Sequence, residues 1–213
     1  MYTPSLFREA DVARLFDIIE AHPFGTLVAQ TQVGGLEISH LPFLFDRDAG
    51  PRGELRFHVA RANPIWRAAI DGGQVVTIFS GPHAYVSPRW YERPNEQVPT
   101  WNYAVVHVHG RVEGPLDPEE TRSLLEAMVA RYEARPGNPS PWSMGELDPA
   151  HAEQLVAGIV GLTIRIDHLE GKFKLSQNRD PVDRDRVIDS LAARGGPDDM
   201  EVARLMRESK REL

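Results

Sequence analysis

The sequence predicts an α+β fold, a small antiparallel β-barrel with peripheral helices. Three observations lead to this prediction. Apolar–polar alternations typical of strands recur along the chain, as at Leu55, Phe57 and Val59. Turn signals such as Gly34-Gly35 connect neighbouring strands as hairpins. Helical patterns interrupt six expected strands without alternating with them one by one, which argues against a parallel doubly wound sheet.

The first third of the chain is expected to hold one amphipathic helix followed by strands. Val12, Leu15, Phe16 and Ile19 share one helical face within residues 9–21, and Pro23 ends this helix. Strands are then expected at residues 26–32, 36–45, around 55–59 and 74–79, with a short helix from Pro64 to Ile70 before the last of them.

The segment from Phe79 to Tyr103 is expected to be a loop around which the rest of the chain is organised. It carries two aromatic clusters, Trp90-Tyr91 and Trp101-Tyr103, which flank polar residues and prolines. The prolines argue against a sheet ladder, and flat rings beside polar tips are suited to a planar ligand. The alternative is that the indoles cap a barrel end or fill a dimer seam.

The strand expected from Thr100 to Glu113 has a period of two. Its inward face is expected to carry Ala104, Val106, Val108 and Val112. The opposite face carries Trp101, Tyr103, Val105, His107, His109 and Arg111. This second face is too polar for a core and too bulky for plain exposure to solvent, so it predicts a subunit interface or a ligand wall.

The remainder of the chain is expected to alternate between helices and one strand. Helices are predicted from Asp117 with its capping signal, from Asp148 to about Val156, and at residues 182–193 and 198–211, with a strand at 159–169 and a polar loop at 171–179. The division predicted from this pattern is a barrel domain at residues 1–178 and a helical appendage at residues 179–213.

Composition restricts the classes of function. The formal net charge of −7 argues against coating of nucleic acid or anionic membrane. The absence of cysteine excludes thiolate catalysis and cysteine-ligated metals. No apolar run is long enough to span a bilayer, and the N-terminus lacks the features of a signal peptide, so a cytoplasmic location is expected.

Two polar places supply the mixture of cations and neutral donors that a phosphate group needs. One is Arg61 with Asn63, and the other is the loop with Lys174, Ser176, Gln177, Asn178 and Arg179. His107 and His109 lie on one face at i and i+2, a weak signal for metal or haem, and no metal site is predicted. His40, His83 and Ser80 are ambiguous polar residues with no nucleophile elbow beside them.

A specific resemblance covers residues 1 to about 190. The residues that carry it are Tyr2-x-Pro4-x-x-Phe7, Ser39-His40-Leu41-Pro42, His58-Val-Ala-Arg61-Ala-Asn63, Gly81-Pro-His83-Ala-Tyr85-Val-Ser87-Pro-Arg-Trp90-Tyr91, Val98-Pro-Thr-Trp101-Asn102-Tyr103 and Gly171-Lys172-Phe-Lys174-Leu-Ser176-Gln177-Asn178-Arg179. In this order and spacing the chain resembles the PaiB family of FMN-binding negative transcriptional regulators.

The resemblance implies the FMN-binding split-barrel fold, FMN as the cofactor, and a homodimer in which both chains contribute to flavin sites. Residue chemistry and position then suggest roles within that site. The candidate cofactor-binding residues are His40, Arg61, Asn63, Ser80, Trp101, Asn102, Lys174, Gln177 and Asn178. Among these, Arg61, Asn63 and the residues of the second loop are expected to bind phosphate, and Trp101 and Asn102 the ring.

Three functional hypotheses remain open. The first is a flavin- or redox-responsive regulator, although residues 179–213 carry 8 basic and 9 acidic side chains, which gives direct DNA binding no support from charge. The second is a flavin-dependent oxidoreductase acting on a small substrate. The third is a haem-binding split barrel that uses one of the histidines.

Overall fold

The computed structural model describes residues 1–134 and 136–209, and it confirms the α+β class. An eight-stranded sheet follows the order β3-β2-β6-β7-β8-β5-β4, and β1 pairs with β8 outside this path. Within the described residues no hydrogen-bonded ladder joins β4 back to β3, so the sheet is not closed. No helix among these residues is long and apolar enough to cross a membrane.

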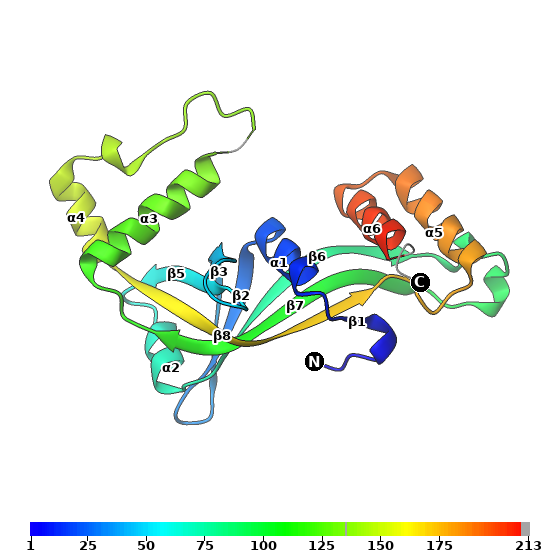
Figure 1. Cartoon of the computed structure of the whole chain (residues 1–213), viewed down its shortest axis with the longest axis horizontal. Helices are drawn as coiled ribbons and strands as arrows, with labels where there is room; N and C mark the ends of the chain where they lie inside the picture. Colours follow the sequence, from blue (N-terminus) through cyan, green and yellow to red (C-terminus); the bar gives the residue numbers. More distant parts are fainter. Residues whose placement is uncertain (135, 210–213) are drawn as a thin grey trace. The chain divides into compact units, whose positions relative to one another are not determined.

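The elements of the first half are β1 (Arg8–Glu9), α1 (Val12–Ala21), β2 (Phe24–Gln30), β3 (Leu36–Pro42), β4 (Leu44–Asp46), β5 (Glu54–Ala60), α2 (Ile65–Asp71) and β6 (Val75–Val86). Those of the second half are β7 (Thr100–Glu113), α3 (Pro118–Glu133), α4 (Pro149–Ala157), β8 (Ile159–Lys174), α5 (Pro181–Arg194) and α6 (Pro197–Glu208). Figure 1 labels the helices and strands.

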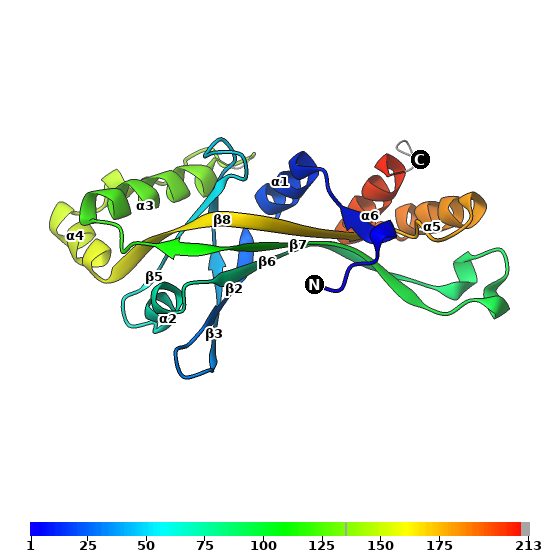
Figure 2. The same ribbon diagram turned by 60° about the horizontal axis from the view of Figure 1, so that its bottom comes forward.

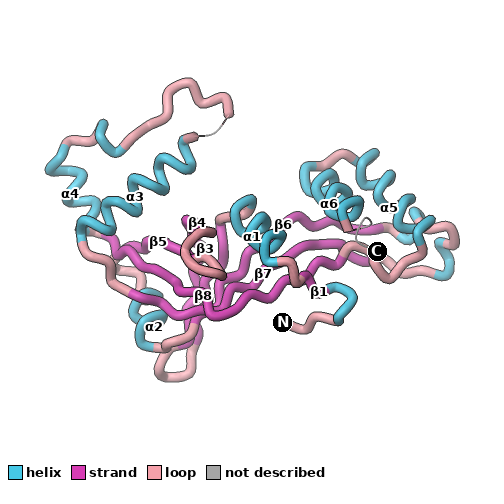
Figure 3. The backbone as a smooth tube through the Cα atoms, in the orientation of Figure 1, coloured by secondary structure: helices cyan, strands magenta, loops and turns pink. Residues whose placement is uncertain are grey.

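The chain folds as two compact units that share its three longest strands. Unit 1 comprises Met1–His22, Phe79–His107 and the chain from Glu170 onward, and unit 2 comprises Pro23–Ile78 and Val108–Leu169. Strands β6, β7 and β8, which Figure 3 shows in magenta, each contribute residues to both units. The predicted division at residue 178 follows a different boundary and remains a prediction.

Unit 2 is built from antiparallel strand pairs. β2 pairs with β3 through the turn at Gly34-Gly35, with Val28 opposite Ile38, and β5 pairs with β8, with Phe57 opposite Leu162. The alternation that predicted β5 buries Leu55, Phe57 and Val59 in the core of this unit. The Asn63 amide nitrogen lies 3.1 Å from Ser39 Oγ and so joins the exit of β5 to β3, near the two ends of the strand path.

The strand predicted at residues 36–45 is interrupted by Phe43. Its side chain is 1% exposed, and its backbone N–H donates to the Pro23 carbonyl, one step beyond the last paired residues of the β2–β3 ladder, Phe24 and Pro42. β3 ends at Pro42, and β4 begins at Leu44, which pairs with Arg56 of β5. Burying the Phe43 ring against Phe57, 5.2 Å away between ring centroids, overrides the local strand pattern at this point.

In unit 1, helix α1 and the helix pair α5–α6 pack on strands. Asp11 caps α1 by accepting from the Ala13 N–H, and Leu15, Phe16 and Ile19 are buried as their spacing predicts. Helices α5 and α6 lie side by side in both Figure 1 and Figure 2 and bury Leu191, Val202 and other apolar side chains.

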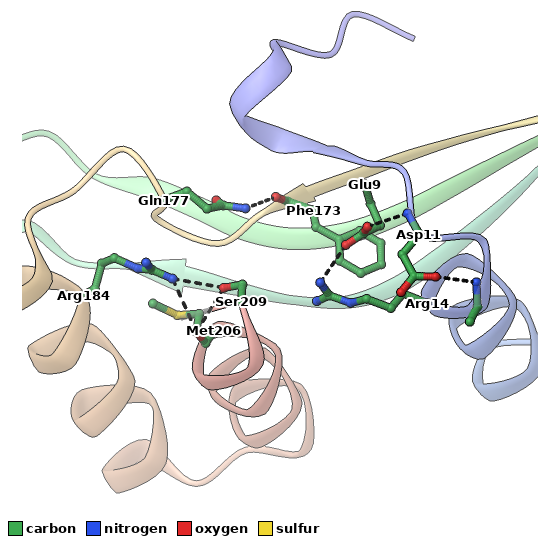
Figure 4. A network of polar contacts seen from close by, with 9 residues as sticks. Glu9, Asp11, Arg14, Phe173, Gln177, Arg184, Met206 and Ser209 are labelled. Atoms are coloured by element: carbon green, nitrogen blue, oxygen red, sulfur yellow. Dashed lines mark hydrogen bonds and ion pairs between the residues drawn. The ribbon is translucent and has the colours of Figure 1, made fainter. Parts of the chain in front are cut away.

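Polar contacts fasten the N-terminal segment and the α5–α6 pair of unit 1, as Figure 4 shows. Arg14 pairs with Glu9 at 2.9 Å. The buried Arg184 of α5 donates to Ser209 Oγ at 3.0 Å, at the end of α6. A guanidinium at this position also meets the negative end of the helix dipole.

Two further predicted boundaries were wrong. β6 continues to Val86, through the first eight residues of the segment expected to be a loop, and β8 continues to Lys174, through residues expected to form the polar loop. Helix α6 ends at Glu208, and the predicted continuation beyond residue 209 lies outside the described residues. The remaining loop at residues 87–99 contains only short 3₁₀ turns.

Candidate functional site

An exposed cluster of rings lies on the outward face of β6 and β7 in unit 1. The Trp101 side chain is 52% exposed and the Tyr85 side chain 39% exposed, and their ring centroids lie 5.9 Å apart in an edge-on arrangement. The His83 ring lies 6.1 Å from Trp101. Large rings at the surface with polar neighbours are unusual for plain solvent exposure and favour a planar ligand or a partner surface.

The loop at residues 87–99 is held in place by three arginines of the C-terminal segment. The Arg179 guanidinium lies over the Tyr91 ring and donates to the Gln97 side chain. Arg186 Nε donates to the Trp90 carbonyl at 2.8 Å, and Arg194 lies 5.1 Å from the Trp90 ring. The first aromatic cluster, Trp90-Tyr91, therefore packs against the C-terminal segment and is not part of the exposed ring cluster.

Asn102 and Gln177, two predicted ligand residues, already have protein partners in unit 1. Asn102 is fully buried, and its amide exchanges hydrogen bonds with Ser176 Oγ and contacts the Met206 sulfur. The Gln177 amide donates to the Phe173 carbonyl and accepts from the Leu175 N–H. These contacts hold the turn after β8 in place. Both side chains therefore bond to other parts of the protein, and their roles as ligands remain a prediction.

The other candidates of unit 1 are more accessible. Lys174 is half-buried and donates from Nζ to Thr100 Oγ1. Burial lowers the pKa of Lys174, and the neighbouring Lys172 and Arg179 lower it further, although Tyr103 opposes them. Ser80 and Asn178 are exposed. A lysine with a lowered pKa beside two other cations is a suitable place for an anion, which would relieve the repulsion.

A pocket of unit 2 has a volume of about 780 Å³ and is lined by Arg61. Its charged side chains are Arg61, Arg122, Glu119 and Glu153, and its buried wall is formed by Val156 and Val160. Arg61 Nε donates to the Ala157 carbonyl at 2.8 Å, and Nη2 donates to the Ile159 carbonyl at 2.7 Å. Among the described residues Nη1 of Arg61 contacts no acceptor, so the guanidinium is oriented and still able to bind an anion.

Asn63 and His40, the other predicted ligands of unit 2, make structural contacts. The Asn63 side chain donates to Ser39 Oγ and accepts from the Ile65 N–H at the start of α2. His40 is exposed, and its Nδ1 lies 2.9 Å from Thr26 Oγ1 across the β2–β3 ladder. Both the nitrogen and the oxygen of the Asn63 side-chain amide have partners, whereas the second ring nitrogen of His40 makes no hydrogen bond in the described structure.

The histidines considered for metal or haem have partners in their own units. His107 lies 4.0 Å from Glu170 in unit 1. The His109 ring stacks on His168 in unit 2, with centroids 4.1 Å apart and planes 11° apart. Haem ligation by either residue stays a prediction.

Comparison with known proteins places this fold in a family. Residues 1–168 match the family model described as "Putative FMN-binding domain". The chain belongs to this FMN-binding family. The protease synthase and sporulation protein PAI 2 of Bacillus subtilis (strain 168) is 35% identical over 208 residues, which cover 98% of this chain and 97% of the relative. The predicted PaiB-type membership is thereby confirmed, and the family supports FMN as the cofactor.

Solved structures confirm the split-barrel fold class. The flavocytochrome Anf3 from Azotobacter vinelandii gives a TM-score of 0.60 at 18% identity, covering 78% of this chain and 69% of that protein. The FAD and heme binding protein from Mycobacterium smegmatis gives a TM-score of 0.58 at 19% identity, covering 89% and 80%. At these identities the likeness shows the fold alone.

Each unit, taken by itself, presents residues whose chemistry suits part of a phosphorylated planar cofactor. Arg61 keeps an open donor at a pocket in unit 2, and unit 1 presents exposed rings with nearby cations. Sequence reasoning missed Arg122 at the pocket, Tyr85 in the exposed ring cluster and Asp198 beside His83. The alternation of β6 could have found Tyr85, but nothing in the sequence signals contacts that depend on how helices pack.

Proposed function

We propose that this PaiB-type protein is a flavin-responsive negative transcriptional regulator that works as a homodimer with FMN. The observation that carries the flavin part is the open Nη1 of Arg61 at a pocket of about 780 Å³. A fixed guanidinium with a remaining donor is a strong site for a phosphate oxygen. The family supplies the identity of the cofactor.

The homodimer is supported by the resemblance and by side chains exposed on the outward faces of the strands. Family members with this fold are expected to build flavin sites from two chains. The exposed ring cluster of unit 1 is one surface that a second copy would cover, and β3 exposes Leu36 and Ile38 as well. Exposed apolar side chains grouped on one face favour an interface.

The regulatory role is supported by family membership and is tested with DNA. The net charge of −7 favours regulation through a partner or a small molecule over direct operator binding. We expect gel-shift assays with promoter fragments to show no specific complex from the purified protein alone, with or without FMN. A specific, salt-sensitive complex that depends on FMN would contradict this indirect mode and show that the protein binds DNA itself.

A flavin-dependent oxidoreductase is the second candidate. It is favoured by the exposure of the Trp101 and Tyr85 rings, because an open face allows a second planar molecule to approach a bound ring. This candidate predicts that NADH or NADPH bleaches the visible absorption of the bound flavin under anaerobic conditions. Flavin that stays oxidised with both nicotinamides would remove it in its simplest form.

A further inference from the structure

We propose that His83 accepts a hydrogen bond from the imide N–H of the flavin ring and that Asp198 is the positioning residue that makes this possible. The inference rests on the proposed binding of FMN and assigns the polar contact that recognises the ring. It concerns unit 1 alone, because both residues lie there.

The surroundings of His83 Nδ1 determine which ring nitrogen carries the proton. Nδ1 lies 3.4 Å from Asp198 Oδ2 and 3.5 Å from the Gly81 carbonyl oxygen. Both neighbours are acceptors, so they favour the neutral tautomer in which Nδ1 carries the hydrogen. In this neutral form Nε2 carries a lone pair and accepts a hydrogen bond. A carboxylate that fixes one imidazole nitrogen in this way prepares the other for a specific partner.

The accepting nitrogen is available to a ligand. The His83 side chain is 59% exposed, and among the described residues it has no contact through Nε2. The His83 ring lies next to the exposed Trp101 ring, and the Trp101 ring also neighbours the Tyr85 ring. One edge of the exposed ring cluster is thus a hydrogen-bond acceptor, and the rest is aromatic surface.

This combination selects a particular ligand chemistry. An aromatic surface stacks any flat ring, but an acceptor at its edge favours a ring that presents an N–H donor in its own plane. The isoalloxazine ring of FMN presents one such donor, the imide N–H between two carbonyl groups. A flat ring without an edge donor would leave the acceptor unpaired and bind less tightly.

Asp198 reaches this position because α6 is anchored at several points. The neighbouring Asp199 pairs with the Arg194 guanidinium, and Arg194 packs over Trp90. Met206 of α6 contacts the buried Asn102 of β7. Asp198 lies beyond residues 1–168, which the family model matches, so the C-terminal helices complete the site from outside the matched domain.

The direct test compares FMN with 3-methyl-FMN, in which a methyl group replaces the imide hydrogen. Fluorescence titration of the full-length protein should give an affinity for FMN roughly tenfold higher than for the methylated analogue, because one hydrogen bond is lost. His83→Phe keeps a flat ring but has no acceptor, and it should bind both flavins with equal affinity. An undiminished preference for FMN in His83→Phe would overturn the assignment.

Asp198→Asn tests the positioning role. An amide can donate to Nδ1 and so favour the opposite tautomer, which would reduce the preference for FMN over 3-methyl-FMN. The control is Asp189→Asn, an exposed acid on α5, which should leave the preference unchanged. The ¹⁵N shifts of His83 should report protonated Nδ1 in the wild type, a readout that a purely structural role would not move. Protonation at Nε2 in the wild type would overturn the proposal.

The outcomes separate this inference from the proposed function. If the wild-type protein binds neither flavin, both the proposed function and the role of His83 fail. If the wild type binds FMN and 3-methyl-FMN equally, flavin binding stands and only the assignment of His83 is overturned.

Discussion

At the scale of single residues, we propose that phosphate recognition depends on Arg61. Its guanidinium is held by two backbone carbonyls and keeps Nη1 for a ligand. We expect Arg61→Ala to weaken FMN binding by about 1.5–3 kcal/mol, the usual range for a charge-assisted hydrogen bond. Isothermal titration calorimetry measures this change.

Two variants control for indirect effects of that substitution. Arg61→Lys keeps the positive charge but lacks the paired N–H donors of the guanidinium. It should bind FMN more tightly than Arg61→Ala and less tightly than the wild type. Arg165→Ala removes an exposed arginine of the same unit that pairs with Glu113 at 2.7 Å, and it should bind FMN as the wild type does. Unchanged affinity in Arg61→Ala would remove Arg61 from the phosphate site.

His58 of β5 provides a prediction about pH. Burial lowers the pKa of His58, and its buried Nδ1 has no hydrogen-bond partner in the described structure. The folded protein therefore favours neutral His58. This contribution to stability is present above the ordinary pKa of about 6.5 and is lost as pH falls toward the lower pKa of the folded state.

We therefore expect the urea midpoint of the wild type to fall between pH 7.5 and pH 5.5, and to fall less in His58→Gln. Burial also lowers the pKa of His22, so the urea midpoint of His58→Gln should still fall in part between these two pH values. An equal fall of the urea midpoint in the wild type and in His58→Gln would show that His58 does not contribute to this pH dependence.

Several residue roles could be predicted from the sequence and others could not. The prediction that Trp101 lies on the face of its strand opposite the core is confirmed, because alternation alone decides which face a side chain takes. The burial of Asn102 follows from the same alternation, but its partner Met206 is 104 positions away. Such distant partners depend on helix packing, which no local pattern encodes.

At the scale of elements, the close pairing of β7 and β8 depends on Gly110. A Cβ atom at this position would lie 2.3 Å from the Arg165 carbonyl oxygen and 2.6 Å from Ile164 Cγ2. Because one obstacle is backbone, the strands would have to separate. We expect Gly110→Ala to lower the free energy of unfolding by about 1–3 kcal/mol.

Chemical denaturation measures this loss, and Gly145→Ala is the matched control. A Cβ atom at Gly145 would have only Ser143 Oγ nearby, at 3.6 Å, so its effect should stay within about 0.5 kcal/mol. A Gly110→Ala protein as stable as the wild type would show that β7 and β8 do not approach each other this closely.

Element type was predicted more successfully than element length. Helices α3 and α4 begin directly after Asp117 and Asp148, the capping aspartates that the sequence signals, and α1 begins at Val12, inside the predicted range of residues 9–21. β6 and β8 extend beyond the expected ends because strands in a ladder continue while a neighbour pairs with them, even through Gly81-Pro82 or Gly171. Pairing of this kind is not visible in one strand alone.

At the scale of the whole molecule, the chain combines a family domain with a C-terminal helix pair that belongs to unit 1. Residues 1–168 carry the family match, whereas the segment with Arg179 and helices α5 and α6 lies beyond it. This segment holds the loop at residues 87–99 through Arg179, Arg186 and Arg194. The sequence predicted helices in this region but not these contacts. It also predicted the class of fold and cofactor, through motifs spread over nearly the whole chain.

The central claim is that this chain binds FMN as a dimer, and one measurement tests it most directly. The purified protein is incubated with FMN, passed through a gel-filtration column, and its visible absorption is recorded across the eluted peak. We predict flavin absorption that elutes with the protein at twice the mass of the chain, with one FMN per chain. A colourless protein peak, or flavin that elutes with a single chain, would contradict the account.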